Sequence, residues 1–327
     1  MRYTPWDTLE SSGWYSFNDE PVEGSSLIAP RLSDPTILLP AESPDGRWHM
    51  FCHTWLGVHH YTSSSGFNWH HEKLLFWRGH SPCIYREGSL YYLLYENHDK
   101  EWGRKKDITK KGSRILISSS SDLITWSEPR IILEAETVSY ASYREGYPRV
   151  ARPQLIEWEG RYILYFGVGE ARMFDTGQKT SVKFSCATAE FIEGPYKVQK
   201  EPLLTIDPLS ETRNLAVGSI RIVPCSDRIA AVECSYIYDR EKNRSRSLML
   251  LLSSTDGFTF ETEKVMQTQP ETGWSSRAIT ACDLKYMEED STWYCYYSAN
   301  GPADGRIPII REYLGLLLGK PGRQKTH

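Results

Sequence analysis

Long apolar runs are missing from this sequence: no stretch approaches the roughly 20 apolar residues that a membrane-spanning helix requires. The N-terminal stretch MRYTPWDTLESSGWYSF has neither the apolar core nor the small-residue cleavage pattern of a secretory leader. Charge of one sign is also scarce, because 38 basic and 42 acidic residues give a net charge of -4 without a long run of either sign. We therefore expect a soluble, cytoplasmic protein with neither nucleic acid nor a membrane as its partner, and the sequence does not indicate an oligomeric state.

Paired cysteine motifs are missing as well. The seven cysteines are odd in number, and none of them stands in a CxxC spacing. Most of them lie inside apolar runs, which is typical of buried free thiols rather than of disulfides or a metal site. Histidines crowd the region between residues 53 and 98, but their spacings match no zinc pattern. We expect no metal and no cofactor.

Sustained helical periodicity is rare, whereas aromatic residues are abundant. The chain has 11 Trp and 20 Tyr, and aromatics make up 13% of its residues. Such residues favour β-strands, and their flat faces also stack on sugar rings. The composition thus indicates a β-rich protein and leaves a carbohydrate ligand open.

One sequence unit recurs five times: an apolar run, a short polar turn with Gly or Asp, and an aromatic-rich run. It reads DPTILLPAESPDGRWHMF from Asp34, SPCIYREGSLYYLLYE from Ser81 and RPQLIEWEGRYILYF from Arg152, and returns more loosely from Val217 and Ala278. A second signature of small polar residues, a turn and an aromatic, such as SSSSDLITW, follows each of the first four units. This alternation predicts an all-β fold, a five-bladed β-propeller with four-stranded antiparallel blades around a central funnel.

We expect a single propeller domain over residues 1–327, with blades that start near residues 34, 81, 152, 217 and 278. Only RIPIIREYLGLLLGK follows the hairpin of the fifth unit, so the N-terminal stretch around GWYSF is the candidate to complete that blade and close the ring. A pair of β-sandwiches is the rival fold, but it would not explain one hairpin signature that recurs five times.

Propeller geometry predicts where the functional side chains gather. The first strand of each blade lines the channel and the second runs antiparallel to it, so the start of the first and the end of the second meet at one mouth. The side chains expected there with Asp34 are His53, Trp55, His80, Ser81, Glu96, His98, Arg149, Arg152, Glu170, Ser219, Glu233 and Arg277. A funnel of carboxylates, arginines, histidines and aromatics suits a small, hydroxyl-rich ligand.

The motifs SDPTILL…DGRWHMF, GSLYYLLYE, GRYILYF and SSSSDLITW resemble those of the five-bladed glycoside hydrolases. These are the family 43 arabinanases and xylosidases, the family 32 fructosidases and the family 130 mannoside phosphorylases. The resemblance implies that one carboxylate in the funnel activates water or attacks the anomeric carbon, while a carboxylic acid protonates the leaving oxygen. It also implies that Asp34 is this base or nucleophile.

The chain departs from the family pattern at other strand starts. Family 43 carries an Asp and a Glu at the starts of the third and fourth blades, where this chain reads ARPQLI and AVGSIRI, and the family 32 motifs fail at HSPCI and ARPQL. The acid must then come from elsewhere on the mouth.

Glu233 is the first candidate, because the apolar stretch AVECSYIY would raise its carboxyl pKa, although a structural ion pair with an arginine is the alternative. Glu96 is the second candidate, and Glu145 lies on a loop where solvation is its simpler role.

The arginines and tryptophans leave two interpretations open. Arg149, Arg152 and Arg277 would bind an anionic sugar or inorganic phosphate through forked hydrogen bonds, or would neutralise a carboxylate such as Asp34 structurally. The tryptophans that would stack on a sugar or else pack between blades are Trp55, Trp102 and Trp274.

From these observations we predict a glycosidase that acts on a small glycoside or oligosaccharide in the central funnel. The alternatives are a phosphorylase that uses inorganic phosphate bound by the arginines, and a carbohydrate-binding propeller without catalysis.

Overall fold

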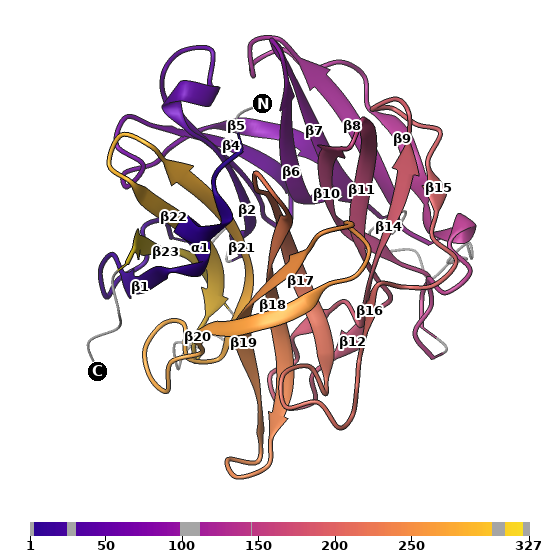
Figure 1. Cartoon of the computed structure of the whole chain (residues 1–327), viewed down its shortest axis with the longest axis vertical. Helices are drawn as coiled ribbons and strands as arrows, with labels where there is room; N and C mark the ends of the chain where they lie inside the picture. Colours follow the sequence, from indigo (N-terminus) through magenta and orange to yellow (C-terminus); the bar gives the residue numbers. More distant parts are fainter. Residues whose placement is uncertain (1–2, 25–30, 99–111, 145, 303–310, 323–327) are drawn as a thin grey trace.

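The computed structural model describes residues 3–24, 31–98, 112–144, 146–302 and 311–322. Antiparallel strands dominate this part of the chain and form five blades around a central axis (Figure 1). The inner strands, each in contact with the next around the axis, are β2 (Ser33–Leu38), β6 (Gly79–Glu87), β10 (Val150–Trp158), β17 (Ala216–Pro224) and β21 (Ala278–Met287). The predicted all-β five-bladed propeller is therefore confirmed. No helix among the described residues is long and apolar enough to cross a membrane.

Blades one and two each continue outward with three strands in chain order. Blade one adds β3 (Trp48–His53), β4 (Gly57–Ser63) and β5 (His70–Trp77), and blade two adds β7 (Leu90–Asn97), β8 (Arg114–Ser120) and β9 (Arg130–Glu134). The SSSSDLITW motif forms the turn between β8 and β9, where Ser120 accepts the N–H of Leu123 and Asp122 accepts that of Thr125. Short 3-10 turns span Pro40–Glu42 and Ala135–Thr137.

Blades three and four differ at their outer edges. Blade three consists of β10, β11 (Arg161–Val168) and β14 (Lys183–Ala189), with two short outer strands, β15 (Lys197–Val198) and β16 (Leu204–Thr205). A separate small hairpin, β12 (Ala171–Arg172) and β13 (Lys179–Thr180), is inserted between β11 and β14. Blade four is regular, with β17, β18 (Ile229–Asp239), β19 (Arg244–Ser254) and β20 (Glu261–Thr268).

Blade five joins the two ends of the described chain. Its strands are β21, β22 (Thr292–Asn300), β23 (Glu312–Pro321) and, on the outside, β1 (Ser12–Ser16), which follows the short helix α1 (Trp6–Glu10). In the β1–β23 pair Trp14 lies opposite Gly319. A Cβ at Gly319 would lie 2.9 Å from the Trp14 ring, so the glycine leaves room for the indole. The GWYSF stretch thus contributes the fourth strand of this blade.

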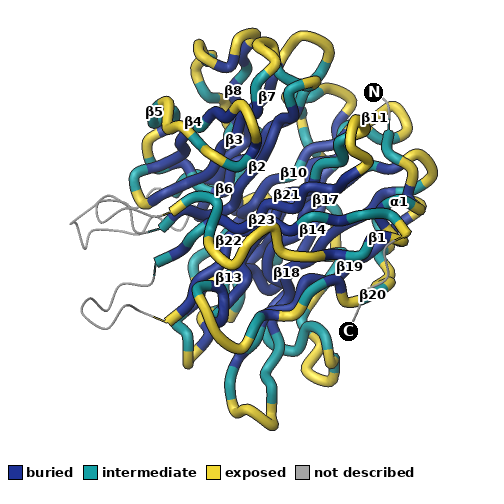
Figure 2. The backbone as a smooth tube through the Cα atoms, turned by 90° about the vertical axis from the view of Figure 1, so that its left-hand side faces the viewer, coloured by how far each residue is buried: buried dark blue, intermediate teal, exposed yellow. Residues whose placement is uncertain are grey.

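The core lies between the blades, where neighbouring sheets pack face to face. Between blades four and five, for example, Met249 and Val232 pack in one apolar cluster with Leu284 and Trp293. Buried backbone runs through the middle of the molecule while exposed backbone is confined to connections and edges (Figure 2). All seven cysteines are buried, which confirms the prediction of buried thiols.

A bulge at the start of each inner strand prepares the functional site. The pairing of each inner strand with the second strand of its blade shifts register near the channel mouth. These shifts enclose Asp34, Ser81, Arg152, Gly218 and Thr280, together with Pro35, Pro82, Pro153 and Val217. The first three are not glycines but have positive φ angles of 50°, 50° and 52°. A bulge re-aims a side chain, and such backbone strain often marks functional positions.

Candidate functional site

A cavity of about 480 Å³ opens at this mouth. The first three blades and the segment before β2 supply its lining, which consists of Arg31, Asp34, His53, Trp55, Arg78, His80, Ser81, His98, Arg149, Arg152, Glu170 and Lys179. Its volume fits a small ligand such as one or two sugar rings.

The inserted hairpin β12–β13 explains why the cavity does not extend over blades four and five. Met173, in the turn of this hairpin, packs against Ala216, Tyr236 and Ala278 at the inner ends of those blades. The carbonyl of Thr176 in the same turn accepts a hydrogen bond from the side chain of Arg277, at the start of blade five. The mouth is thus covered on one side, and the open part belongs to blades one to three.

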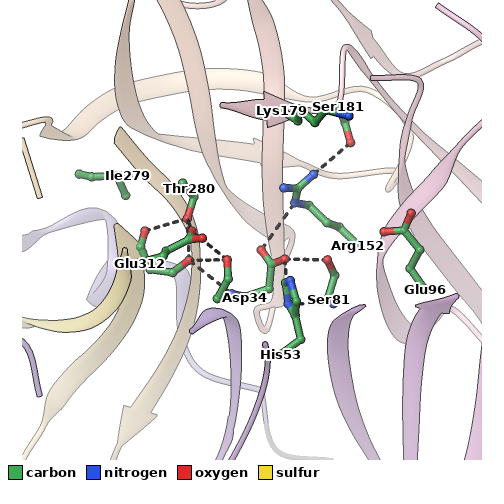
Figure 3. Close-up of polar contacts among 12 residues, drawn as sticks. Asp34, His53, Ser81, Glu96, Arg152, Lys179, Ser181, Ile279, Thr280 and Glu312 are labelled. Atoms are coloured by element: carbon green, nitrogen blue, oxygen red, sulfur yellow. Dashed lines mark hydrogen bonds and ion pairs between the residues drawn. The ribbon is translucent and has the colours of Figure 1, made fainter. Parts of the chain in front are cut away.

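Asp34 is the centre of the polar contacts drawn in Figure 3. Its side chain is buried, and Oδ2 accepts a hydrogen bond of 2.6 Å from the Ser81 hydroxyl. Arg152 Nε lies 3.6 Å from Oδ1, and among the described residues Oδ1 has no hydrogen-bond partner. One oxygen of the carboxylate is therefore held by a hydrogen bond, and the other is buried and faces Arg152 without a hydrogen bond.

The surroundings of Asp34 keep it ionised. Burial would raise its pKa, but the Arg152 guanidinium, together with His53 and the Ser81 hydrogen bond, outweighs burial and lowers the pKa below its ordinary value. His53 Nδ1 accepts the backbone N–H of Ser81 at 3.2 Å, so this nitrogen carries no proton. Burial also holds the pKa of His53 well below its usual range. The pair at neutral pH is thus a carboxylate beside a neutral imidazole.

A second buried carboxylate, Glu312 at the start of β23, supports the strand that carries Asp34. Glu312 accepts hydrogen bonds from Ser33 Oγ at 2.9 Å and Arg31 Nε at 2.7 Å, and another from Thr280 Oγ1. The sequence analysis missed Glu312, Arg31, Arg78 and Lys179. The one signal for Glu312 was a charged residue at the start of the apolar run EYLGLLLG.

Glu96 lies behind the lining residues Arg149 and His98 and is not free to act as an acid. It is fully buried, and Arg149 grips both of its oxygens at 2.7 and 3.0 Å while His98 Nε2 lies 3.0 Å away. Burial opposes ionisation, but Arg149 and His98 hold the pKa of Glu96 well below its usual range. Glu170 is paired with Arg149 and with Lys179, and despite burial these cations lower its pKa too. The prediction that Glu96 donates a proton does not fit this geometry.

Glu233 does not reach the mouth, which corrects the first choice of acid. It lies on β18 opposite Ile220 and is fully buried. Arg213 binds it in a fork, with Nε 2.9 Å from Oε1 and Nη2 2.5 Å from Oε2. Burial raises the pKa of Glu233 despite Arg213. Glu233 is nevertheless not among the described residues that line the cavity. The structure therefore shows Glu233 in a structural ion pair, the alternative to its role as the acid.

The other expected ligand-binding residues fall into two groups. Those that line the cavity are His53, Trp55, His80, Arg149 and Arg152, and burial lowers the pKa of His80 to about 4. Arg277 instead donates to the Thr176 carbonyl at 2.7 Å, and Trp274 stacks on Tyr297 and lines a separate hollow of about 350 Å³. Ser219 is buried in β17 and is not among the described lining residues. Glu145 and Trp102 lie outside the described residues.

The departure from the family pattern at the third and fourth blades has a structural basis. Arg152 occupies the bulge of blade three, and Gly218 that of blade four. A Cβ at Gly218 would lie 1.9 Å from the carbonyl oxygen of Cys234, so this position has no space for a carboxylate side chain. Asp34 is therefore the single carboxylate among the residues inside the five register shifts.

A scan against protein-family models and a search of curated proteins found no match. Solved structures do match over most of the chain. Zg3597, a family 117 glycoside hydrolase of Zobellia galactanivorans, is 13% identical with a TM-score of 0.59, covering 95% of this chain and 91% of its own. An exo-1,5-alpha-L-arabinanase from a bovine ruminal metagenomic library is 13% identical with a TM-score of 0.55, and the coverages are 92% and 94%. A xylan beta-1,4-xylosidase of Bacillus halodurans is 14% identical with a TM-score of 0.59, covering 89% of this chain and 53% of its own. This chain has the five-bladed propeller fold that these glycoside hydrolases share.

Proposed function

We propose that this protein is a glycosidase that cleaves a small glycoside or oligosaccharide in the cavity, with the Asp34 carboxylate as base or nucleophile. The observation that carries the proposal is Asp34 itself. It is a buried, ionised carboxylate with one unpartnered oxygen, re-aimed by a strained bulge into a cavity of about 480 Å³. The fold, which it shares with known glycoside hydrolases, supports the same reaction class.

The contacts around Asp34 match either role of a catalytic carboxylate. As a base, its free Oδ1 would take a proton from a water molecule whose oxygen attacks the anomeric carbon while the bond to the leaving group breaks. As a nucleophile, the same oxygen would bond to the anomeric carbon directly, and water would later release the sugar. In both cases Ser81 fixes the carboxylate and Arg152 keeps it ionised.

The carboxylates next to the cavity are poorly suited to protonate the leaving group. Glu96 and Glu170 are both held as carboxylates by Arg149, so neither provides a proton at neutral pH. In an aryl glycoside with a good leaving group, the phenolate leaves the anomeric carbon without protonation. They are therefore the substrates on which activity should be sought first.

Two observations favour the alternative functions. Five cationic side chains against two carboxylates line the cavity, which would also suit inorganic phosphate as the attacking group. Arg152 and Gly218 stand at the strand starts where the resemblance to family 43 implies carboxylates, which would suit a propeller that binds sugar without cleaving it.

One experiment separates the three functions: release of 4-nitrophenol from a panel of 4-nitrophenyl glycosides, measured with and without phosphate. We expect release without phosphate, because Asp34 already supplies the base or nucleophile. Release that depends on phosphate would identify a phosphorylase. Saturable binding of a sugar without any release would identify a binding propeller and overturn the proposal.

A further inference from the structure

We propose that the sugar bound in this cavity carries a carboxylate, as a uronic acid does, and that Arg152 and Arg78 bind that carboxylate. The inference deepens the proposed glycosidase function by naming its substrate class, and it rests on that function only for the cleavage step.

The pairing of charges around the cavity leaves two guanidinium groups available. Glu170 neutralises Lys179 and, together with the buried Glu96, also pairs with Arg149. Arg31, before β2, is paired with the buried Glu312 at the start of β23. Two cations remain, Arg152 and Arg78, and Asp34 is the one carboxylate left among the described lining residues. The cavity thus has an excess of one positive charge.

Arg152 is buried with unused hydrogen-bonding capacity. Its side chain is 6% exposed, and its Nε has no hydrogen-bond partner among the described residues. Nη1 donates one long hydrogen bond of 3.4 Å, to Ser181 Oγ (Figure 3). A guanidinium has five N–H donors, and buried donors are normally satisfied. Nε faces Asp34, and an oxyanion in the cavity would supply acceptors for the remaining N–H groups of Arg152, whose charge would then lie between the two anions.

Arg78 is the second available cation in the cavity lining. It is half-buried, has a positive φ of 60° at the junction of β5 and β6, and forms no ion pair among the described residues. Trp55 is 47% exposed and offers an aromatic face in the same cavity. An aromatic face with a nearby guanidinium suits a sugar ring that bears a planar carboxylate.

Free phosphate would use the same guanidinium groups, but two observations favour an anion carried by the sugar. The cavity of about 480 Å³ is much larger than one phosphate needs. The ionised Asp34 also already occupies the position of the attacking or base group, so a second free anion beside it is not required.

The test compares matched ligands on the intact protein. Binding of glucuronate and galacturonate is measured by titration calorimetry against glucose, galactose and inorganic phosphate, and kcat/KM is measured on the 4-nitrophenyl uronides against the matching neutral glycosides. We expect at least about a tenfold preference for one uronate, in binding and in kcat/KM, and we expect it to weaken as salt rises.

Two variants assign the preference to the arginines. Arg78→Met should reduce the uronate preference about tenfold, because Arg78 does not contact Asp34. Arg152→Lys keeps the charge beside Asp34 but loses the fork, so it should reduce the same preference. Arg130→Met, whose side chain is 67% exposed on blade two, is the matched control and should leave the preference unchanged.

Each outcome decides between the inference and the proposed function. Uronate binding that depends on Arg78 and Arg152, without turnover of any glycoside, would support the ligand class and contradict the glycosidase. Equal turnover of uronides and neutral glycosides would support the glycosidase and overturn the inference. Binding of phosphate in place of uronate, or an unchanged preference in both variants, would also overturn it.

Discussion

At the scale of single residues, the chemistry of this site depends on how each carboxylate is paired. Glu96 and Glu233 each accept two hydrogen bonds from one arginine, so both carboxylate oxygens have a partner. Asp34 instead has Arg152 at 3.6 Å from Oδ1, too far for a hydrogen bond but close enough to stabilise the charge. This looser pairing keeps Asp34 ionised without binding both of its oxygens in a fork, and Asp34 lines the cavity.

Arg152→Met should move the acidic limb of the pH profile. Activity requires ionised Asp34, so kcat/KM falls as pH drops through the pKa of Asp34 in the free protein. Arg152 lowers that pKa against the effect of burial, so its removal raises the pKa and shifts the acidic limb to higher pH, by about one unit or more. The pH dependence of kcat/KM on an aryl glycoside measures this shift. Arg152→Lys, which keeps the charge, should retain most of the wild-type limb, and an unmoved limb in Arg152→Met would show that Asp34 is not the titrating group.

At the scale of strands and hairpins, the sequence predicted where the inner hairpins lie but not which way their side chains point. β18 is buried on both faces, so its apolar pattern does not reveal that Glu233 lies under Arg213 rather than at the mouth. The hairpin β12–β13 has strands of two residues each, which are too short to leave a periodic signal. Its turn nevertheless holds Arg277 away from the cavity.

Sequence patterns did not predict the bulges either, although three of the residues inside them, Asp34, Ser81 and Arg152, were expected at the mouth. Asp34 and Arg152 were expected at the mouth because they start inner strands, and both line the cavity. The positive φ angles of 50° to 52° that Asp34, Ser81 and Arg152 share are seen only in the structure, and the register shift at Thr280 has no such angle. A propensity-based argument predicts no positive φ for a serine or an arginine.

Gly218→Ala tests the bulge of blade four. Gly218 has a φ of 81°, and an added Cβ would meet the Cys234 carbonyl oxygen at 1.9 Å, so the backbones of β17 and β18 must move apart. We expect a loss of about 3 kcal/mol or more in the free energy of unfolding, measured by urea denaturation. Gly160→Ala is the control, because Gly160 has a φ of 75° with no atom within 4 Å of the added Cβ, and it should cost only about 1 kcal/mol. Equal losses in the two variants would contradict the close approach at blade four.

At the scale of the whole molecule, side chains of the inner strands tie successive blades together. Asp283 accepts the backbone N–H of Ile37 at 2.6 Å, which links blade five to blade one. Arg221 joins Asp283 at 2.7 Å and Gln154 at 2.7 Å, which links blade four to blades five and three. The outer strand β1 pairs with β23, so the described N-terminal and C-terminal strands share one blade. A ring closed in this way holds the bulges of blades one to three around one cavity.

The central claim is that this cavity belongs to an enzyme in which Asp34 does the chemistry, and Asp34→Asn tests it most directly. The substitution keeps the shape of the side chain and removes its charge, so the fold and ligand binding should survive. We predict that kcat/KM on the best aryl glycoside falls by about a thousandfold or more, while Asp227→Asn, which alters an exposed carboxylate paired with Arg228, leaves it unchanged. A folded Asp34→Asn protein that retains activity within about tenfold of the wild type would contradict the account, since removal of an essential catalytic group costs far more.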